Sequence, residues 1–141
     1  MASKIYNSFA DDEARGNIVL DGDTFGVILV TAGYTPDIDA HTKRSDITNE
    51  VAATGYTAGG NTVSLTVTKD TTNDREDIGL GGTSWAAATI TAAGAVYFKK
   101  RGGAASADEL IAFIDFGGDV SSTNDTFTLN ASTLRMQNLA V

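Results

Sequence analysis

The sequence predicts an all-β protein: an antiparallel β-sandwich or small barrel of about eight strands, preceded by a short N-terminal α-helix. Three observations support this prediction. Short apolar segments recur along the chain and are separated by Gly, Asn and Asp residues. In the clearest segment, residues 62–68, apolar and hydroxyl side chains alternate. Helical periodicity is nearly absent after residue 15.

The size of the chain predicts one domain with its own core. The 141 residues are 42% hydrophobic and include no cysteine, so disulfides and thiolate metal sites are excluded. We expect a single domain over residues 1–141, with a helix in residues 1–15 and a β module in residues 16–141. Without disulfides, its stability has to come from core burial or from contacts with other chains.

The first element expected is a helix over residues 3–15. Ser3 is a suitable N-cap, and Tyr6 and Phe9 fall on one side at helical spacing. Gly16 is a natural end for the helix. The apolar side is narrow, which predicts that this helix packs against a larger body.

The remaining elements are expected to be strands joined by turns. A hairpin is predicted from residues 17–20 and 24–31 around the turn Asp21-Gly22-Asp23. Residues 33–49 form a long polar excursion with a short helical or irregular piece near residues 44–47. Further strands are expected at residues 62–68, 75–80, 84–91, 95–99, 109–116, 125–129 and 134–141. The strand at 109–116 is expected to end at Gly117-Gly118, and Trp85 is expected in the core.

The charge of the chain argues against nucleic-acid binding. The net charge is −8, and the pI is about 4.4, whereas phosphate backbones are held by clustered Lys and Arg. The run Lys99-Lys100-Arg101 is short and is typical of a strand end or loop. The N-terminus is polar and the apolar runs have only strand length, so we expect no signal peptide, no membrane contact and a location in a cytosol or in a particle assembled there.

Residues 33–41 contain the only proline and the only histidine. Asp37, Asp39 and His41 alternate, so in an extended segment they could bind a divalent ion from one side. The alternative is that Pro36-Asp37 opens a turn in which the acids cap backbone amides and the histidine is solvated. A structural metal site needs about four ligands, and no second ligand segment is visible. We therefore favour the turn and expect no metal and no cofactor.

The residue patterns of catalytic sites are missing as well. There is no Gly-x-Ser-x-Gly motif, and one histidine would have to serve any catalytic triad. Residues 55–60 are glycine-rich but lack the Lys-Ser/Thr of a phosphate loop. We expect that the protein is not an enzyme.

Aromatic residues are the best candidates for partner contacts. Tyr34 and Tyr56 lie beside glycines in expected loops, where tyrosines often anchor interfaces. Together with the N-terminal helix and the 33–41 segment, they give five predicted interaction residues: Tyr6, Phe9, Tyr34, Pro36 and Tyr56.

An ordered series of motifs covers most of the chain. The motifs are Tyr6-Asn7-Ser8-Phe9, Val27-Ile28-Leu29-Val30-Thr31, Tyr34-Thr35-Pro36-Asp37-Ile38-Asp39-Ala40-His41, Asn49-Glu50-Val51, Gly55-Tyr56-Thr57-Ala58-Gly59-Gly60, Asn73-Asp74-Arg75, Trp85, Ala95-Val96 and Leu110-Ile111-Ala112-Phe113-Ile114-Asp115-Phe116-Gly117. In this order they resemble a widespread group of small tailed-bacteriophage proteins encoded among virion structural genes. Residues 102–108 and the segment beyond residue 129 match the group less clearly.

The resemblance implies a non-enzymatic virion protein, foremost a capsid decoration or cement protein on the outer surface of the shell. Its partners would be the major capsid protein and further copies of itself, with a trimer favoured. An acidic surface suits the outside of a shell better than its DNA-lined interior. One alternative is a tail, baseplate or receptor-binding component. A second is a metal- or carbohydrate-binding module that uses Asp37, Asp39 and His41.

Overall fold

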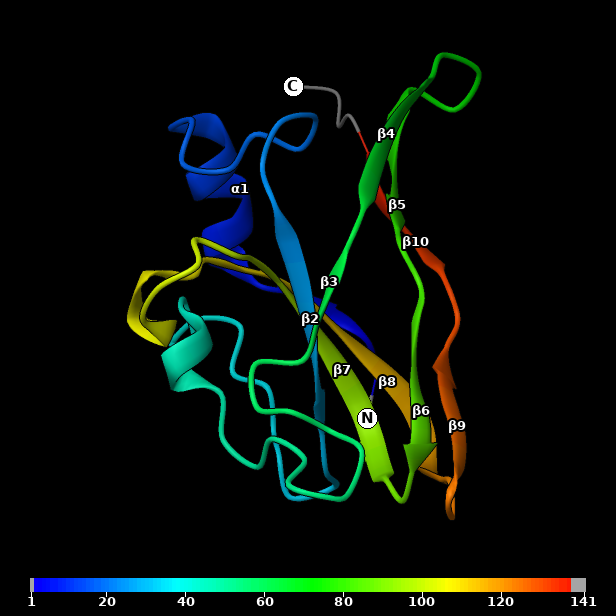
Figure 1. Cartoon of the computed structure of the whole chain (residues 1–141). Helices are drawn as coiled ribbons and strands as arrows, with labels where there is room; N and C mark the ends of the chain where they lie inside the picture. Colours follow the sequence, from blue (N-terminus) through cyan, green and yellow to red (C-terminus); the bar gives the residue numbers. More distant parts are fainter. Residues whose placement is uncertain (1, 138–141) are drawn as a thin grey trace.

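The computed structural model describes residues 2–137 and confirms the predicted all-β class. This part of the chain forms ten strands, one α-helix and two short 3-10 helices (Figure 1). In chain order they are β1 (Lys4–Ile5), α1 (Asn7–Ala14), β2 (Phe25–Val30), η1 (Arg44–Asp46), β3 (Asn61–Val63), β4 (Leu65–Asp70), β5 (Arg75–Leu80), β6 (Thr83–Ala88), β7 (Thr91–Lys99), η2 (Ala105–Ala107), β8 (Leu110–Ser121), β9 (Asp125–Leu129) and β10 (Ser132–Gln137). Within residues 2–137, no helix has the length and apolar character of a membrane span.

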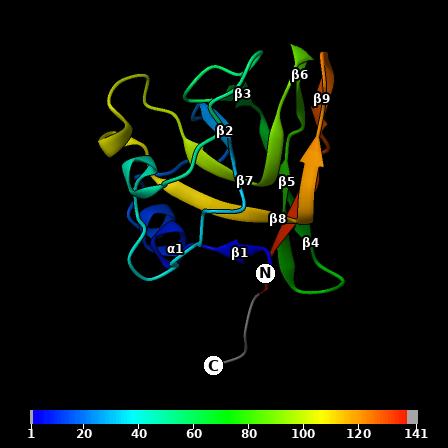
Figure 2. The ribbon, with the colours of Figure 1, turned by 90° about the horizontal axis from the view of Figure 1, so that it is seen from below.

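The strands form two layers of a β-sandwich (Figures 1 and 2). One layer is a five-stranded antiparallel sheet with the order β1-β8-β7-β2-β3. The other consists of a three-stranded sheet, β10-β5-β4, and a two-stranded sheet, β6-β9. Only Ser64 separates β3 from β4, so the chain crosses between the layers at that point. The predicted antiparallel sandwich is confirmed.

The hydrophobic core has two parts. The larger cluster lies between the layers and includes Trp85, as the sequence predicts. The smaller cluster lies on the outer face of the five-stranded sheet, where Ile28, Val30 and Phe98 contact residues from the loops. Every residue of β2 is buried, because both faces of that strand are covered.

The N-terminal segment differs from its prediction. Residues 3–15 do not form one helix, because Lys4 and Ile5 pair with β8 as a short strand and α1 begins only at Asn7. The Ser3 hydroxyl accepts a hydrogen bond from the Asp115 amide at 2.9 Å and is not an N-cap. The predicted end of the helix is confirmed, since Gly16 has a φ of 78°.

The predicted hairpin at residues 17–31 is wrong in its first arm. Residues 17–20 form no strand, although Ile18 and Leu20 are buried in the larger cluster. The Asp23 carboxylate accepts the Val19 amide at 2.7 Å, and the Val19 carbonyl accepts the Asp23 amide at 2.9 Å. These local hydrogen bonds close a tight loop in place of strand pairing.

The later strands follow the predictions with four differences. Strand β6 ends at Ala88 and β7 begins at Thr91, so residues 92–94 lie within a strand and not between the predicted strands 84–91 and 95–99. The segment 62–68 divides between β3 and β4, and of its three valine and leucine side chains Val67 is exposed. β8 does not end at Gly117-Gly118 but continues to Ser121 through an irregularity in its pairing with β7. The last strand begins at Ser132, earlier than predicted, and residues 138–141 of that prediction lie outside the described residues.

Candidate functional site

The predicted polar excursion forms a strap, residues 33–47, across the outer face of the five-stranded sheet. Tyr34, Ile38 and Ile47 of the strap pack on the smaller core cluster. The short helical or irregular piece predicted near residues 44–47 is the 3-10 helix η1. Near η1, the Arg44 amide donates to the Asp108 carbonyl at 2.9 Å, which ties the strap to the segment that leads into β8.

A chain of polar contacts fixes the other end of the strap. The hydroxyl groups of Tyr6 and Tyr34 lie 2.7 Å apart, and the Tyr34 hydroxyl lies 2.9 Å from Nδ1 of His41. The Asp37 amide donates to the same Nδ1 at 3.2 Å, so this nitrogen is an acceptor. The Tyr34 hydroxyl therefore donates to His41 and accepts from Tyr6. Burial raises the pKa of Tyr6, and its hydrogen bond to Tyr34 raises it further.

The three candidate metal ligands do not form a metal site. One carboxylate oxygen of Asp37 accepts the amides of Asp39 and Ala40 at 3.1 and 3.0 Å, and hydrogen bonds from the Ala40 and Asp39 amides lower the pKa of Asp37. The Asp39 carboxylate is hydrogen-bonded to the Asn7 side chain. His41 uses Nδ1 for Tyr34 and the Asp37 amide. Over residues 2–137, no three or more His, Cys, Asp or Glu side chains are arranged to hold a metal ion.

Tyr56 fixes a second loop to the same sheet. Its hydroxyl accepts the Leu29 amide at 3.1 Å and donates to Glu50 at 2.7 Å. The same Glu50 oxygen accepts the Gly59 amide at 2.7 Å. Tyr34 and Tyr56 thus have a common structural role, because each tyrosine hydroxyl ties a glycine-containing loop to the rest of the fold.

The predicted interaction residues require a correction. Tyr6 and Phe9 are 0% exposed, Tyr34 is 2% exposed and Pro36 is also buried. Side chains inside the chain offer no surface to a partner, so the contact role predicted for these four residues is wrong. Tyr56 is half-buried, and its hydroxyl is engaged within the chain.

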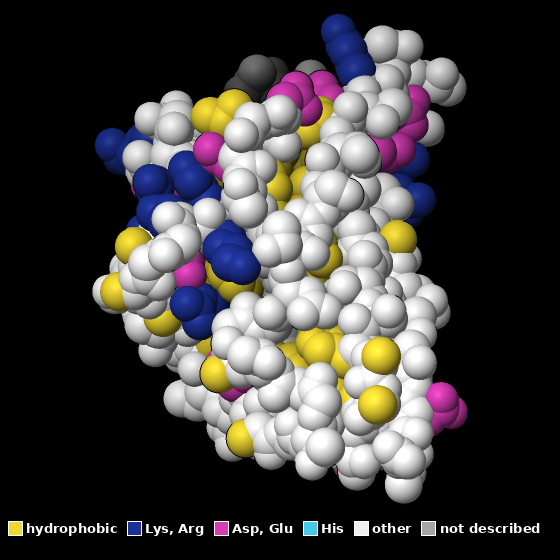
Figure 3. All heavy atoms as spheres, viewed as in Figure 1, with side chains coloured by type: hydrophobic (Ala, Val, Ile, Leu, Met, Phe, Trp, Pro, Cys, Tyr) yellow, Lys and Arg dark blue, Asp and Glu magenta, His cyan; other side chains and the backbone are white. Residues whose placement is uncertain are grey.

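The basic run Lys99-Lys100-Arg101 lies at the end of β7, where the sequence predicts a strand end or loop, and it takes part in internal contacts. Lys99 lies 2.9 Å from the Asp23 carboxylate, and Lys100 donates to the Thr62 hydroxyl at 3.0 Å. Arg101 binds Glu109 at 2.6 Å. Figure 3 shows Lys and Arg side chains gathered on this side of the molecule.

Two buried carboxylates anchor this cluster. Glu109 is 3% exposed and also lies 3.5 Å from Lys43 of the strap. Asp108 is 1% exposed and binds Arg44 at 2.8 Å. Burial alone would raise the pKa of Glu109, but hydrogen bonds from Arg101 and the charges of Lys43 and Arg101 hold it below its ordinary value. The cluster thus fastens the strap to β8.

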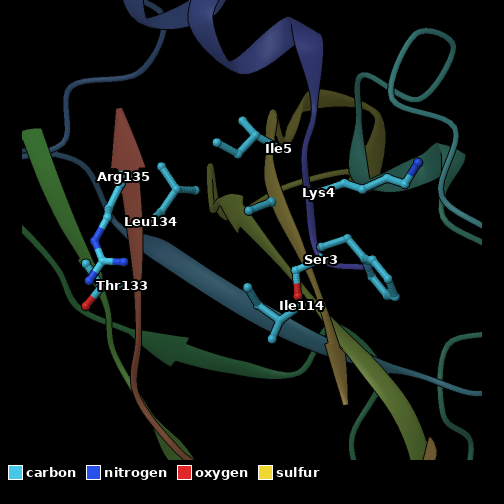
Figure 4. Close-up of a pocket in the computed structure, with 9 residues that line it drawn as sticks. Ser3, Lys4, Ile5, Ile114, Thr133, Leu134 and Arg135 are labelled. Atoms are coloured by element: carbon cyan, nitrogen blue, oxygen red, sulfur yellow. The ribbon is translucent and has the colours of Figure 1, made fainter. Parts of the chain in front are cut away.

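A recess lies between the edges of the two layers, and we call it the edge groove (Figure 4). Its volume is about 170 Å³. It is lined by Ser3, Lys4, Ile5, Ala112, Phe113, Ile114, Thr133, Leu134 and Arg135. Strand β1 ends the five-stranded sheet and β10 ends the three-stranded sheet, so the groove runs between two sheet edges.

A second hollow, of about 360 Å³, continues from the edge groove and shares Ile114 with it. Phe116, Val120 and Phe127 line this second hollow, and Val120 is 45% exposed. Neither recess is marked by a local sequence pattern, because each is lined by residues from separate segments of the chain. The exposed aliphatic side chains of Ile5 and Val120 become visible only in the fold.

In comparisons with known proteins, no protein-family model, no curated protein and no solved structure matches this chain.

Proposed function

We propose that this chain is a bacteriophage virion structural protein that decorates and stabilises the outer surface of a capsid shell. The series of motifs that resembles the small phage proteins supports the proposal. The structural observation that supports it most directly is the edge groove, which combines an apolar recess with sheet edges. Sheet edges and apolar recesses are features by which β modules attach to other proteins.

The rigidity of the long loops also supports this proposal. The chain uses its buried polar side chains to tie loops to the sheets, as Tyr34, Tyr56 and Glu109 illustrate. A protein that clamps neighbouring subunits together has to keep its shape while it is loaded, so fixed loops are an advantage. The net charge of −8 suits a surface that faces solvent on the outside of a DNA-filled particle.

The proposed mechanism is the burial of additional surface across junctions between capsid subunits. A stable protein–protein contact buries about 800 Å² per partner, and several copies around a symmetry axis would add such areas. The partners would be the major capsid protein and further copies of this chain, with a trimer as the favoured assembly.

Cryo-electron microscopy of purified virions tests this proposal. We expect density for the sandwich on the outside of the shell, at many copies per particle. Density in the tail or baseplate, with a low copy number in virion gels, would support the alternative virion role. Virions that lack the chain altogether would rule out both roles.

A further inference from the structure

The edge strand β10 offers an unpaired side next to the edge groove. Strand β10 pairs with β5 in the register Leu134 opposite Ile78, and β5 pairs with β4 on its other side. Within residues 2–137 no strand pairs with the opposite side of β10, and Thr133, Leu134 and Arg135 of β10 line the groove. An extended segment placed there would continue the three-stranded sheet through backbone hydrogen bonds.

The floor of the groove is suited to an apolar side chain. Figure 4 shows Leu134 of β10 on one side and Ile5 of β1 with Ile114 of β8 on the other. Ile5 is 37% exposed, which leaves apolar surface open to solvent. A volume of about 170 Å³ is similar to the ~150 Å³ of an apolar cavity that holds benzene. One aliphatic or aromatic side chain of a partner would fit.

The charge of the groove indicates the chemistry of the partner. Arg135 is among its lining residues, none of which is Asp or Glu, whereas the side chain of Lys4 points away from the groove (Figure 4). Arg135 has a side chain 61% exposed, and its nearest carboxylate, Asp77, is 3.7 Å away and binds Arg75 at 2.9 Å. In a chain with a net charge of −8, this local positive charge is complementary to an acidic segment.

We infer that the edge groove binds an extended acidic and apolar segment of another protein, which adds a strand beside β10 and inserts an apolar side chain between Ile5 and Leu134. The inference that the partner is a protein rests on the proposed function. A binding experiment in solution reports on the groove alone, whereas the virion map reports on location, so the two can fail separately.

The test uses synthetic peptides and the full chain. The probe is the acetylated and amidated peptide Glu-Val-Thr-Val-Thr-Val-Glu, titrated to millimolar concentration while backbone amide NMR shifts are recorded. We expect saturable shifts in residues 3–5, 112–114 and 133–135. The same peptide with lysine at both ends should bind about three- to tenfold more weakly, and a peptide with proline at the central position should bind still more weakly because it lacks a backbone donor.

Matched variants localise the binding. Ile5→Asp should weaken binding by at least about tenfold because it places a charge in the apolar floor. Val67→Asp is its control, because Val67 has the same 37% exposure on β4, at the opposite edge of the three-stranded sheet. The Val67→Asp variant should bind the peptide normally. Arg135→Glu should reverse the preference for acidic over basic ends, whereas Lys69→Glu should not.

Three results would overturn the inference. The first is no saturable shift at millimolar peptide, and the second is equal binding of the acidic and basic peptides. The third is self-association in analytical ultracentrifugation that Ile5→Asp abolishes while the peptides fail to bind, because the occupant would then be a second copy of this chain.

Discussion

The hydroxyl groups of Tyr6 and Tyr34 lie 2.7 Å apart, although 28 residues separate them in the sequence. Tyr6 directly precedes α1, and Tyr34 lies in the strap that covers the five-stranded sheet. This one contact joins the N-terminal segment to the strap above the smaller core cluster. It makes the strap part of the folded body.

The two tyrosines should be energetically coupled. Tyr34→Phe leaves the buried Tyr6 hydroxyl without this partner, so we expect a loss of about 1 to 3 kcal/mol in the free energy of unfolding. Tyr6→Phe should cost a similar amount, and the double variant should cost less than the sum of the two. Urea unfolding of the four proteins measures the coupling, and strictly additive losses would contradict the shared hydrogen bond.

The fold class could be predicted because alternation and turn residues are local signals. The strand at residues 75–80 and the burial of Trp85 followed from them directly. The hairpin at residues 17–31 failed because Asp21-Gly22-Asp23 favours any tight turn, and here Asp23 closes a loop by binding the Val19 amide. A turn signal does not state whether a paired strand precedes it.

The sites were harder to predict, because they depend on contacts between distant segments. Tyr34 and Tyr56 lie beside glycines, a pattern that predicts exposed residues in contact with another protein. In the structure, however, their hydroxyl groups are hydrogen-bonded to His41 and Glu50 of the same chain. The edge groove brings together residues 3–5, 112–114 and 133–135. None of these three segments carries a local pattern that marks a groove, and the sequence predicts a helix, not a sheet edge, for residues 3–5.

A comparison of Gly16 with Gly60 separates the energetic cost of backbone strain from the cost of a steric clash. Gly60 has a φ of 65°, and a Cβ there would lie 1.8 Å from the Val27 carbonyl oxygen. Gly16 has a φ of 78°, but a Cβ there would meet nothing within 4 Å. We expect Gly16→Ala to cost about 1 to 2 kcal/mol and Gly60→Ala about 2 to 5 kcal/mol. Equal losses in urea unfolding would show that the contact with Val27 relaxes freely.

The carboxylates of the strap should give no metal dependence. Asp37 uses a carboxylate oxygen on two backbone amides, and His41 uses Nδ1 on Tyr34. We expect the melting temperature to stay unchanged when Zn²⁺ or a chelator is added. His41→Ala should lower it in both conditions, because the Tyr34 hydroxyl and the Asp37 amide lose their acceptor. A rise with Zn²⁺ that His41→Ala removes would revive the metal-site hypothesis.

Glu109 should contribute to loss of stability in acid. Its pKa is held below the ordinary value in the folded chain, where Arg101 and Lys43 favour the carboxylate over the opposing effect of burial. The unfolded state therefore binds more protons, so this contribution is present above the unfolded pKa of about 4.3 and is lost as the pH falls through the folded pKa. Glu109→Gln should cost about 1 to 3 kcal/mol at pH 7, and its difference from the native chain should shrink below about pH 4.

Glu13 is a control for Glu109, because its pKa is shifted in the opposite direction. Although Glu13 is exposed, partial desolvation raises its pKa in the folded chain, and repulsion by Glu76 raises it further. The folded state then binds more protons, so this carboxylate costs stability at neutral pH and the cost disappears as the pH falls. Glu13→Gln should leave the free energy of unfolding at pH 7 unchanged or higher, with a difference from the native chain that also vanishes in acid. Urea unfolding of the three proteins from pH 3 to pH 7 measures both differences. If both variants changed stability in the same direction at pH 7, the opposite shifts of the two pKa values would be contradicted.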